Sequence, residues 1–172
     1  MFRAMEDFRA CWAYEAECTL KVFAAIPDAA SGTLVSEGHR DLKRMAWHLV
    51  ESLIEMPARM GLEIEGRERL EASGFIGAPP ATMAEVVAAY TRASESLLRQ
   101  LQGWTDATLL QEDDMYGQTW KRGASLFVLV THQVHHRGQM TVLMRQAGLA
   151  VPGIYGPSKE GWAAMGMEVP RV

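Results

Sequence analysis

The sequence contains little cysteine: Cys11 and Cys18 are the two among its 172 residues. They lie in one predicted helix, where a seven-residue separation places them about 10 Å apart, too far for a disulfide bridge. The spacing does not match a CxxC metal site either. A disulfide-stabilised secreted scaffold and a thiolate metal site are therefore both excluded. We expect both residues to be reduced, half-buried thiols in a cytoplasmic protein.

Long apolar runs are also lacking. No stretch approaches the roughly 18 consecutive apolar residues that a membrane-spanning helix requires. The first residues, MFRAMEDFRACWAYEAE, contain acids early and no apolar run of the length found in signal peptides. We therefore expect a chain that neither crosses a membrane nor uses one as a partner.

Positive charge is not in excess. The chain has 17 Lys and Arg against 21 Asp and Glu, which gives a formal net charge of −4. The one dense basic group, Arg40, Lys43 and Arg44, is interrupted by Asp41. Because a phosphate-binding surface needs a basic patch, this distribution excludes nucleic acid as the main partner. The length predicts a single domain at residues 1–172, large enough to fold without a disulfide or a metal.

Helical periodicity is what the sequence has in abundance. Apolar residues recur every three or four positions in four long stretches, whereas no long strand pattern occurs. The predicted helices cover roughly residues 3–26, 39–60, 82–102 and 124–148. Residues 115–120 are predicted to form a turn or a small hairpin, and residues 159–165 one helical turn. This pattern predicts an all-α four-helix bundle with long inter-helix loops.

The last long helix carries an unusual run, THQVHHRGQM, which holds three of the five histidines. At 100° per residue, His132 and His136 lie one above the other beside the apolar stripe, whereas His135 points away from it. The i, i+4 spacing brings two imidazoles close enough to share one metal ion. The alternative is that both are core-edge histidines that only hydrogen-bond a carbonyl group.

A metal site needs a third ligand, and the candidates are His39 and His48. His39 lies at a helix start beside a glycine, where an exposed or capping role is expected. His48 lies in mid-helix at the edge of the apolar stripe, and this position favours it. Residue 133 is Gln, so the HExxH signature of a metalloprotease is absent.

Four polar residues near these histidines have open roles. Arg137 points into the apolar stripe, so it either extends to the bundle end or pairs with a buried acid. Gln139 either hydrogen-bonds a ligand histidine or lies at the helix edge. Glu51 is expected at a solvated acidic edge. The alternative for Glu51, and for the nearby Glu55, is to orient an imidazole or act as a general base.

Three features together resemble the DinB-like superfamily, which includes the YfiT-type proteins. They are a histidine in the second helix, the run HxxxHHRGQM late in the fourth, and the tail VPGIYGPS. The resemblance covers essentially the whole chain and implies an up-down-down-up four-helix bundle. It also implies a divalent ion, often nickel or zinc, held at one end of the bundle. Carried over to this sequence, the ligands are His48, His132 and His136.

The resemblance implies several functions, because fold does not determine activity. Relatives include thiol S-transferases that use bacillithiol or mycothiol, a maleylpyruvate isomerase and a metal-dependent hydrolase. The leading hypothesis is a metal-dependent thiol S-transferase acting on a small-molecule substrate with a low-molecular-weight thiol. The alternatives are a metal-dependent hydrolase and a non-enzymatic, metal-binding stress-response bundle. A homodimer is expected.

The aromatic residues of the predicted loops have two interpretations. They either wall a pocket over the metal or cover the ends of the bundle. The residues are Trp104, Tyr116, Trp120, Tyr155 and Trp162.

Overall fold

The computed structural model describes residues 1–74 and 76–171. Each of the four periodic stretches forms a long helix. They are α1 (Met5–Ala24), α2 (Leu42–Arg59), α3 (Met83–Gln100) and α4 (Arg122–Gln146). Short 3-10 turns occur at Asp28–Ala30, Arg67–Arg69, Leu101–Gly103 and Asp106–Leu110. The prediction of a mostly helical chain is therefore confirmed.

Capping residues set the helix starts. At α3, the side chain of Thr82 accepts a hydrogen bond from the backbone N–H of Glu85, and the Glu85 carboxylate accepts one from the Thr82 N–H. This capping box was predicted from the sequence. At α2 the prediction began too early, at His39. The helix begins at Leu42 because the Asp41 carboxylate accepts a hydrogen bond from the N–H of Arg44 at 2.6 Å.

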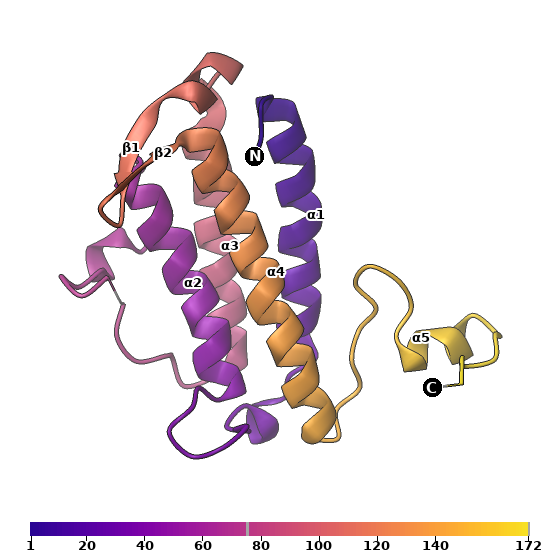
Figure 1. Ribbon diagram of the computed structural model, residues 1–172. Coiled ribbons are helices and arrows are strands. Elements are labelled where there is room, and N and C mark those ends of the chain that lie inside the picture. Colours follow the sequence, from indigo (N-terminus) through magenta and orange to yellow (C-terminus); the bar gives the residue numbers. More distant parts are fainter. Residues whose placement is uncertain (75, 172) are drawn as a thin grey trace.

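The long helices pack around a shared apolar core (Figure 1). α1 and α2 each pack against both α3 and α4. The most buried large side chains of this core include Trp12, Trp47 and Tyr90. In the described part of the chain, no helix is long and apolar enough to cross a membrane.

A small two-stranded sheet corrects the all-α prediction. Strands β1 (Glu112–Met115) and β2 (Gln118–Lys121) pair antiparallel, with Asp113 opposite Trp120. Their two-residue connection, Tyr116-Gly117, has φ values of 61° and 79°. Positive φ at both positions is the geometry of a type I′ turn, whose twist matches that of the strands. The sequence predicted a turn or small hairpin at residues 115–120. That range covers the turn and most of β2, but only the last residue of β1.

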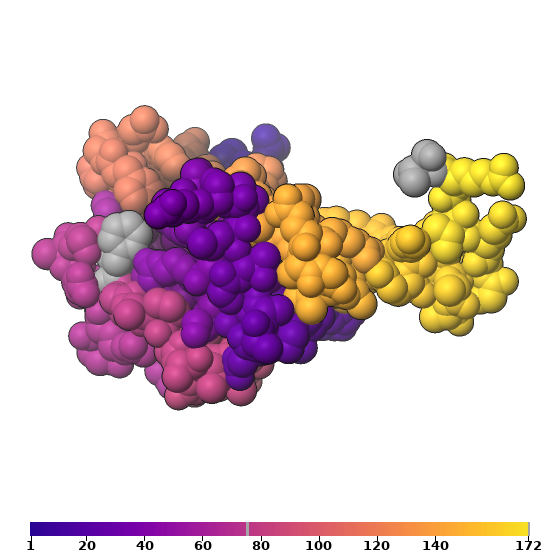
Figure 2. Space-filling view, turned by 90° about the horizontal axis from the view of Figure 1, so that it is seen from below, coloured from indigo at the N-terminus to yellow at the C-terminus, as the bar shows by residue number. Residues whose placement is uncertain are grey.

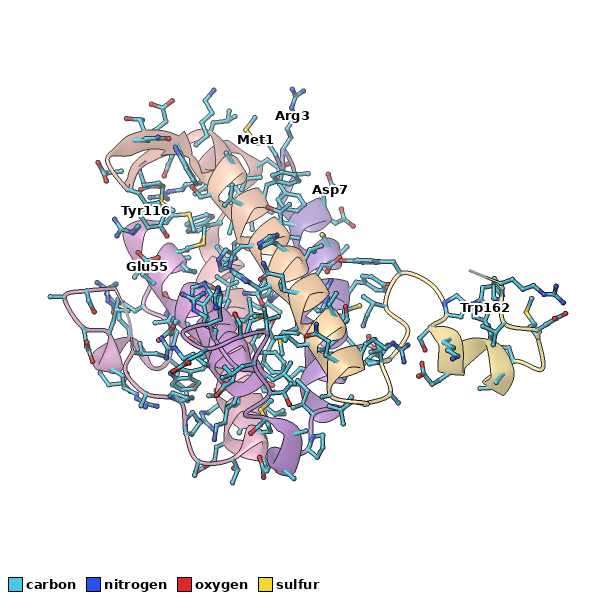
Figure 3. The ribbon with its side chains drawn as sticks, turned by 60° about the horizontal axis from the view of Figure 1, so that its bottom comes forward. Met1, Arg3, Asp7, Glu55, Tyr116 and Trp162 are labelled. Atoms are coloured by element: carbon cyan, nitrogen blue, oxygen red, sulfur yellow. The ribbon has the colours of Figure 1, made fainter. Side chains whose placement is uncertain are left out.

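The C-terminal segment leaves the packed helices and projects from them (Figures 1 and 2). It ends in the short helix α5 (Lys159–Ala164), which contains no buried residue. The bidentate ion pair between Arg145 and Glu160 joins α5 to the end of α4. Trp162 lies on this projecting part, away from the four long helices (Figure 3). It therefore does not wall the histidine site of its own chain.

Arg137 is buried in the core, with 2% of its surface exposed. It forms an ion pair with the Glu15 carboxylate and donates hydrogen bonds to the Glu15 carbonyl and the Thr19 hydroxyl. The Tyr155 hydroxyl, from the tail, donates to the same carboxylate at 2.7 Å. Of the two roles open to Arg137, pairing with a buried acid is confirmed. The pair ties α4 to α1 and anchors the start of the tail.

Candidate metal centre

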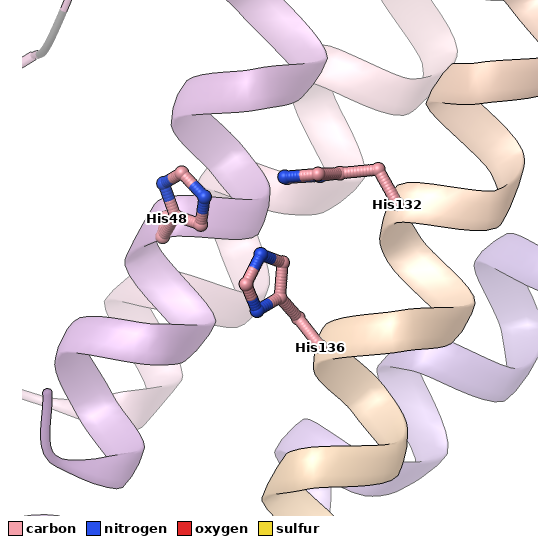
Figure 4. A group of neighbouring side chains, drawn as sticks. All are labelled: His48, His132 and His136. Carbon is pink, nitrogen blue, oxygen red and sulfur yellow. The ribbon is translucent and has the colours of Figure 1, made fainter.

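Three histidines from two facing helices converge on one point (Figure 4). His132 and His136 lie one turn apart on α4, and His48 faces them from α2. One nitrogen from each ring lies within 4.8 Å of the others, and all three residues are half-buried. The ring centroids are 4.5 to 5.1 Å apart. The structure therefore brings together the three residues that the sequence singled out.

The other two histidines lie outside this group. His39 is exposed in the segment before α2, where its Nδ1 is 2.9 Å from the Ser36 hydroxyl. His135 is exposed on α4, as the helical wheel predicted. Gln133, at the position of the missing glutamate, is fully buried. Its amide nitrogen donates to the Leu49 carbonyl and the Ser52 hydroxyl and so joins α4 to α2.

Gln139 fixes the orientation of the His136 ring. Its side-chain oxygen lies 2.8 Å from Nδ1 of His136, and its amide nitrogen lies 3.2 Å from Nε2 of His135. Because an amide oxygen only accepts, Nδ1 of His136 carries the proton and Nε2 keeps its lone pair. A ligand histidine in proteins is held in this way by a second group. Of its two predicted roles, Gln139 takes the one of hydrogen-bonding a ligand candidate.

Glu51 is buried, with 2% exposure, and the expectation of a solvated acidic edge is wrong. Arg44 donates to both carboxylate oxygens at 2.8 and 3.0 Å, and the backbone N–H of Ile76 donates at 3.3 Å. Burial raises the pKa of Glu51, but His48 and Arg44 outweigh it and hold the pKa below its usual value. The segment after α2 folds over this carboxylate, which the helical pattern of α2 does not reveal.

His48 and His132 each have a buried Nδ1 without a well-formed hydrogen bond to the residues that the structure describes. Nδ1 of His48 lies 3.4 Å from Oε2 of Glu51, within ion-pair reach but outside hydrogen-bond geometry. Burial, then the charges of the neighbouring histidines and Arg40, lowers the pKa of His132 to about 4. Burial also lowers the pKa of His136. A neutral imidazole is the form that binds a metal ion, and the lowered pKa values of His132 and His136 favour that form.

A cavity of about 440 Å³ opens onto the histidines, with His48 and His132 in its wall. At its other end the Tyr116 hydroxyl donates a 2.6 Å hydrogen bond to the Glu55 carboxylate, which also pairs with Arg59 (Figure 3). Among the loop aromatics, Tyr116 thus lines the cavity that reaches the histidines, whereas Trp104 stacks under Arg122 away from that cavity. Sequence reasoning missed Arg59, although it lies four residues after Glu55 on α2.

A second cavity, of about 470 Å³, lies on the other side of His136. It is walled by the segment before α2 and by the last turns of α4. The candidate centre therefore lies between two cavities, one reaching His48 and His132 and the other reaching His136.

The sequence matches the DinB family over residues 1–170. The chain belongs to the DinB family. It is similar to YrdA, an uncharacterised protein of Bacillus subtilis strain 168, with 38% identity over 174 residues and full coverage of both chains.

Two solved DinB-like proteins share the fold of this DinB-family chain. The one from Bacillus cereus has 36% sequence identity and a TM-score of 0.82, covering 90% of this chain and 100% of the other. YjoA from Bacillus subtilis has 18% identity and a TM-score of 0.67, covering 88% and 98% of the two chains. The second likeness concerns the fold alone.

Three imidazoles form a donor set that suits zinc, nickel, copper or iron. A divalent ion bound by three protein ligands keeps at least one coordination position for a small molecule. The donor chemistry and the convergence of one nitrogen from each of the three rings therefore fit a metal ion at this point of the structure.

Proposed function

We propose that this DinB-family chain is a metal-dependent enzyme that transfers a low-molecular-weight thiol to a small electrophile. His48, His132 and His136 would hold nickel or zinc. The observation that carries the proposal is the cavity of about 440 Å³, which reaches two of these histidines. A purely structural metal site has four protein ligands and no such access.

A divalent ion at this position would supply Lewis acidity, which lowers the pKa of a thiol so that the thiolate forms near neutral pH. The chain supplies orientation. Gln139 keeps the proton of His136 on Nδ1. The buried carboxylate of Glu51 lies beside Nδ1 of His48. The far end of the cavity is polar, because Arg59 pairs there with Glu55 and the Tyr116 hydroxyl donates to the same carboxylate.

A metal-dependent hydrolase is the alternative that the same cavity supports, because the ion would equally acidify a water molecule. Glu55, a carboxylate on the cavity wall, is the group that could then accept a proton. The Glu55 carboxylate already accepts a hydrogen bond from Tyr116 and pairs with Arg59, so it is less available to accept a proton from water. We therefore prefer thiol transfer to hydrolysis. A non-enzymatic, metal-binding stress-response bundle remains the alternative outside catalysis.

Turnover assays separate these functions. Protein loaded with nickel or zinc is incubated with 1-chloro-2,4-dinitrobenzene and either bacillithiol or mycothiol, or with a p-nitrophenyl ester and no thiol. Thiol-dependent conjugation that is lost in His132→Ala and kept in His135→Ala supports the transferase. Ester hydrolysis without conjugation supports the hydrolase. Metal binding without either reaction, over a wider set of electrophiles and esters, contradicts both.

We further infer that the four long helices form the up-down-down-up bundle. Hydrogen bonds between helix ends support it. The start of α1 lies beside that of α4, with Phe2 N donating to Gly123 O at 3.1 Å. The end of α1 lies beside the starts of α2 and α3, through Lys43 N to Ser31 O at 2.9 Å and Met83 N to Asp28 Oδ1 at 2.6 Å.

We also propose that the chain is a single domain, is located in the cytoplasm and forms a homodimer. Its substrate is proposed to be a small molecule. Sedimentation analysis of the purified chain tests the dimer directly. A monomer at micromolar concentration would contradict it.

A further inference from the structure

The second cavity combines an apolar wall with a cationic side chain. Its apolar residues are Val35, Met45, Val142 and Leu143, and its volume is about 470 Å³. Val35 and Val142 both line this cavity and are 59% and 58% exposed, so the cavity presents apolar surface to solvent. Ligand pockets commonly have volumes of roughly 300–1,000 Å³ and mostly apolar walls. The cavity is thus of a size and character that suit an organic molecule.

Arg40 is the charged group of this cavity and lacks an acidic partner. It is half-buried, and within residues 1–74 and 76–171 no carboxylate pairs with it. The adjacent Asp41 is committed to the N-terminus of α2 through the N–H of Arg44. Arg44 itself, one turn further on, is paired with Glu51. A half-buried guanidinium with no counter-charge attracts an anionic group, and its planar fork fits a carboxylate.

The position of the cavity links it to the histidines. His136 and Gln139 form the wall nearest the candidate centre, and Arg40 lies in the same cavity. Figure 2 shows the face on which the segment leading into α2 and the C-terminal half of α4 lie side by side. A molecule held there contacts both the guanidinium and the edge of the histidine cluster.

We propose that this cavity binds an apolar organic anion, with its carboxylate on Arg40 and its hydrocarbon part against Val35, Met45 and Val142. The ligand enters from a different side than a molecule in the cavity that reaches His48 and His132. Binding of this anion does not depend on the proposed function. A role for the anion as a reactant does rest on it.

Binding is tested on the full-length, metal-free protein, so that its failure is distinct from a failure of catalysis. The probes are 4-phenylbutyrate, 4-phenylbutanol and 4-phenylbutylammonium, which share a hydrocarbon part and differ in charge. Methyl resonances of Met45, Val35 and Val142 report the position of the ligand. We expect these resonances to shift, and phenylbutyrate to bind about tenfold more tightly than the alcohol.

Two variants and a control complete the test. Arg40→Gln should abolish the preference for the carboxylate over the alcohol, and Val142→Glu should weaken phenylbutyrate binding by about tenfold or more. Arg3→Gln, which removes the same charge from an exposed site near the N-terminus, should change neither value. Equal affinity for the three probes, shifts confined to other methyl groups, or a carboxylate preference that survives Arg40→Gln would overturn the proposal.

Discussion

Oε2 of Glu51 lies 3.4 Å from Nδ1 of His48, which is three residues earlier on the same helix and therefore on the same side of it. The carboxylate is held in place by Arg44 and by the backbone of Ile76, and it is almost fully buried. A carboxylate beside the non-coordinating nitrogen of a ligand histidine orients the ring and raises its basicity. The relationship assigns Glu51 a positioning role at the candidate centre.

Glu51→Gln keeps the shape of the side chain and removes its charge. We expect the affinity for zinc or nickel to fall about 10- to 100-fold, because His48 loses the group that orients it. Calorimetric titration of the metal-free protein measures this change. Glu37→Gln, at an exposed position of the preceding loop, is the matched control. Equal affinities for the wild type and Glu51→Gln would remove the positioning role.

The buried ion pair between Arg137 and Glu15 predicts a non-additive pair of substitutions. Arg137→Met leaves the Glu15 carboxylate buried without its cation, which should lower the free energy of unfolding by about 3–5 kcal/mol. The double variant Glu15→Leu/Arg137→Met should recover most of that loss, since no uncompensated charge remains. Denaturant unfolding measures both values. A double variant less stable than Arg137→Met would argue against this interpretation.

Two glycines of α4 should respond to alanine with opposite signs. A Cβ at Gly123 would lie 2.3 Å from the carbonyl oxygen of Phe2, so Gly123→Ala must displace the N-terminal segment and should cost about 1–3 kcal/mol. At Gly138 a Cβ meets nothing within 4 Å. Gly138→Ala should therefore stabilise the helix by roughly 0.5–1 kcal/mol. Thermal unfolding of both variants measures the two changes in stability. Two changes in the same direction would contradict the packing described here for Gly123 and Gly138.

The low pKa of His132 predicts acid sensitivity of the metal-free protein. The pKa is about 4 in the folded chain against an ordinary 6.5, so between these values the unfolded chain binds a proton that the folded chain does not. Stability therefore falls as pH is lowered through this window, by on the order of 1–3 kcal/mol. Unfolding free energies between pH 4 and 7 should show a shallower slope in His132→Gln than in the wild type. Parallel slopes would show that His132 does not cause the effect.

Helix geometry explains what the sequence could predict. The positions of His132, His135 and Arg137 follow from 100° per residue along one long helix, and the structure agrees with each. His48 was favoured over His39 by its mid-helix position, and it is the residue that joins the pair on α4. Local patterns suffice when a residue's neighbours lie on its own helix.

Contacts between distant segments explain what could not be predicted. Glu51 looked exposed because α2 alone does not show that the segment after it brings the backbone N–H of Ile76 onto the carboxylate. Tyr116 reaches Glu55, 61 positions earlier, only because the hairpin folds over the end of α2. The second cavity likewise combines two segments about a hundred residues apart. No periodic pattern reports such pairings.

The central claim is that His48, His132 and His136 bind one divalent ion, and metal content tests it most directly. The protein is purified without an affinity tag and assayed by elemental analysis, as wild type and as His48→Ala, His132→Ala, His136→Ala and His135→Ala. We predict about one nickel or zinc ion per chain, lost in the first three variants and retained in His135→Ala. A wild type that contains no metal and takes up neither added nickel nor added zinc would contradict the claim.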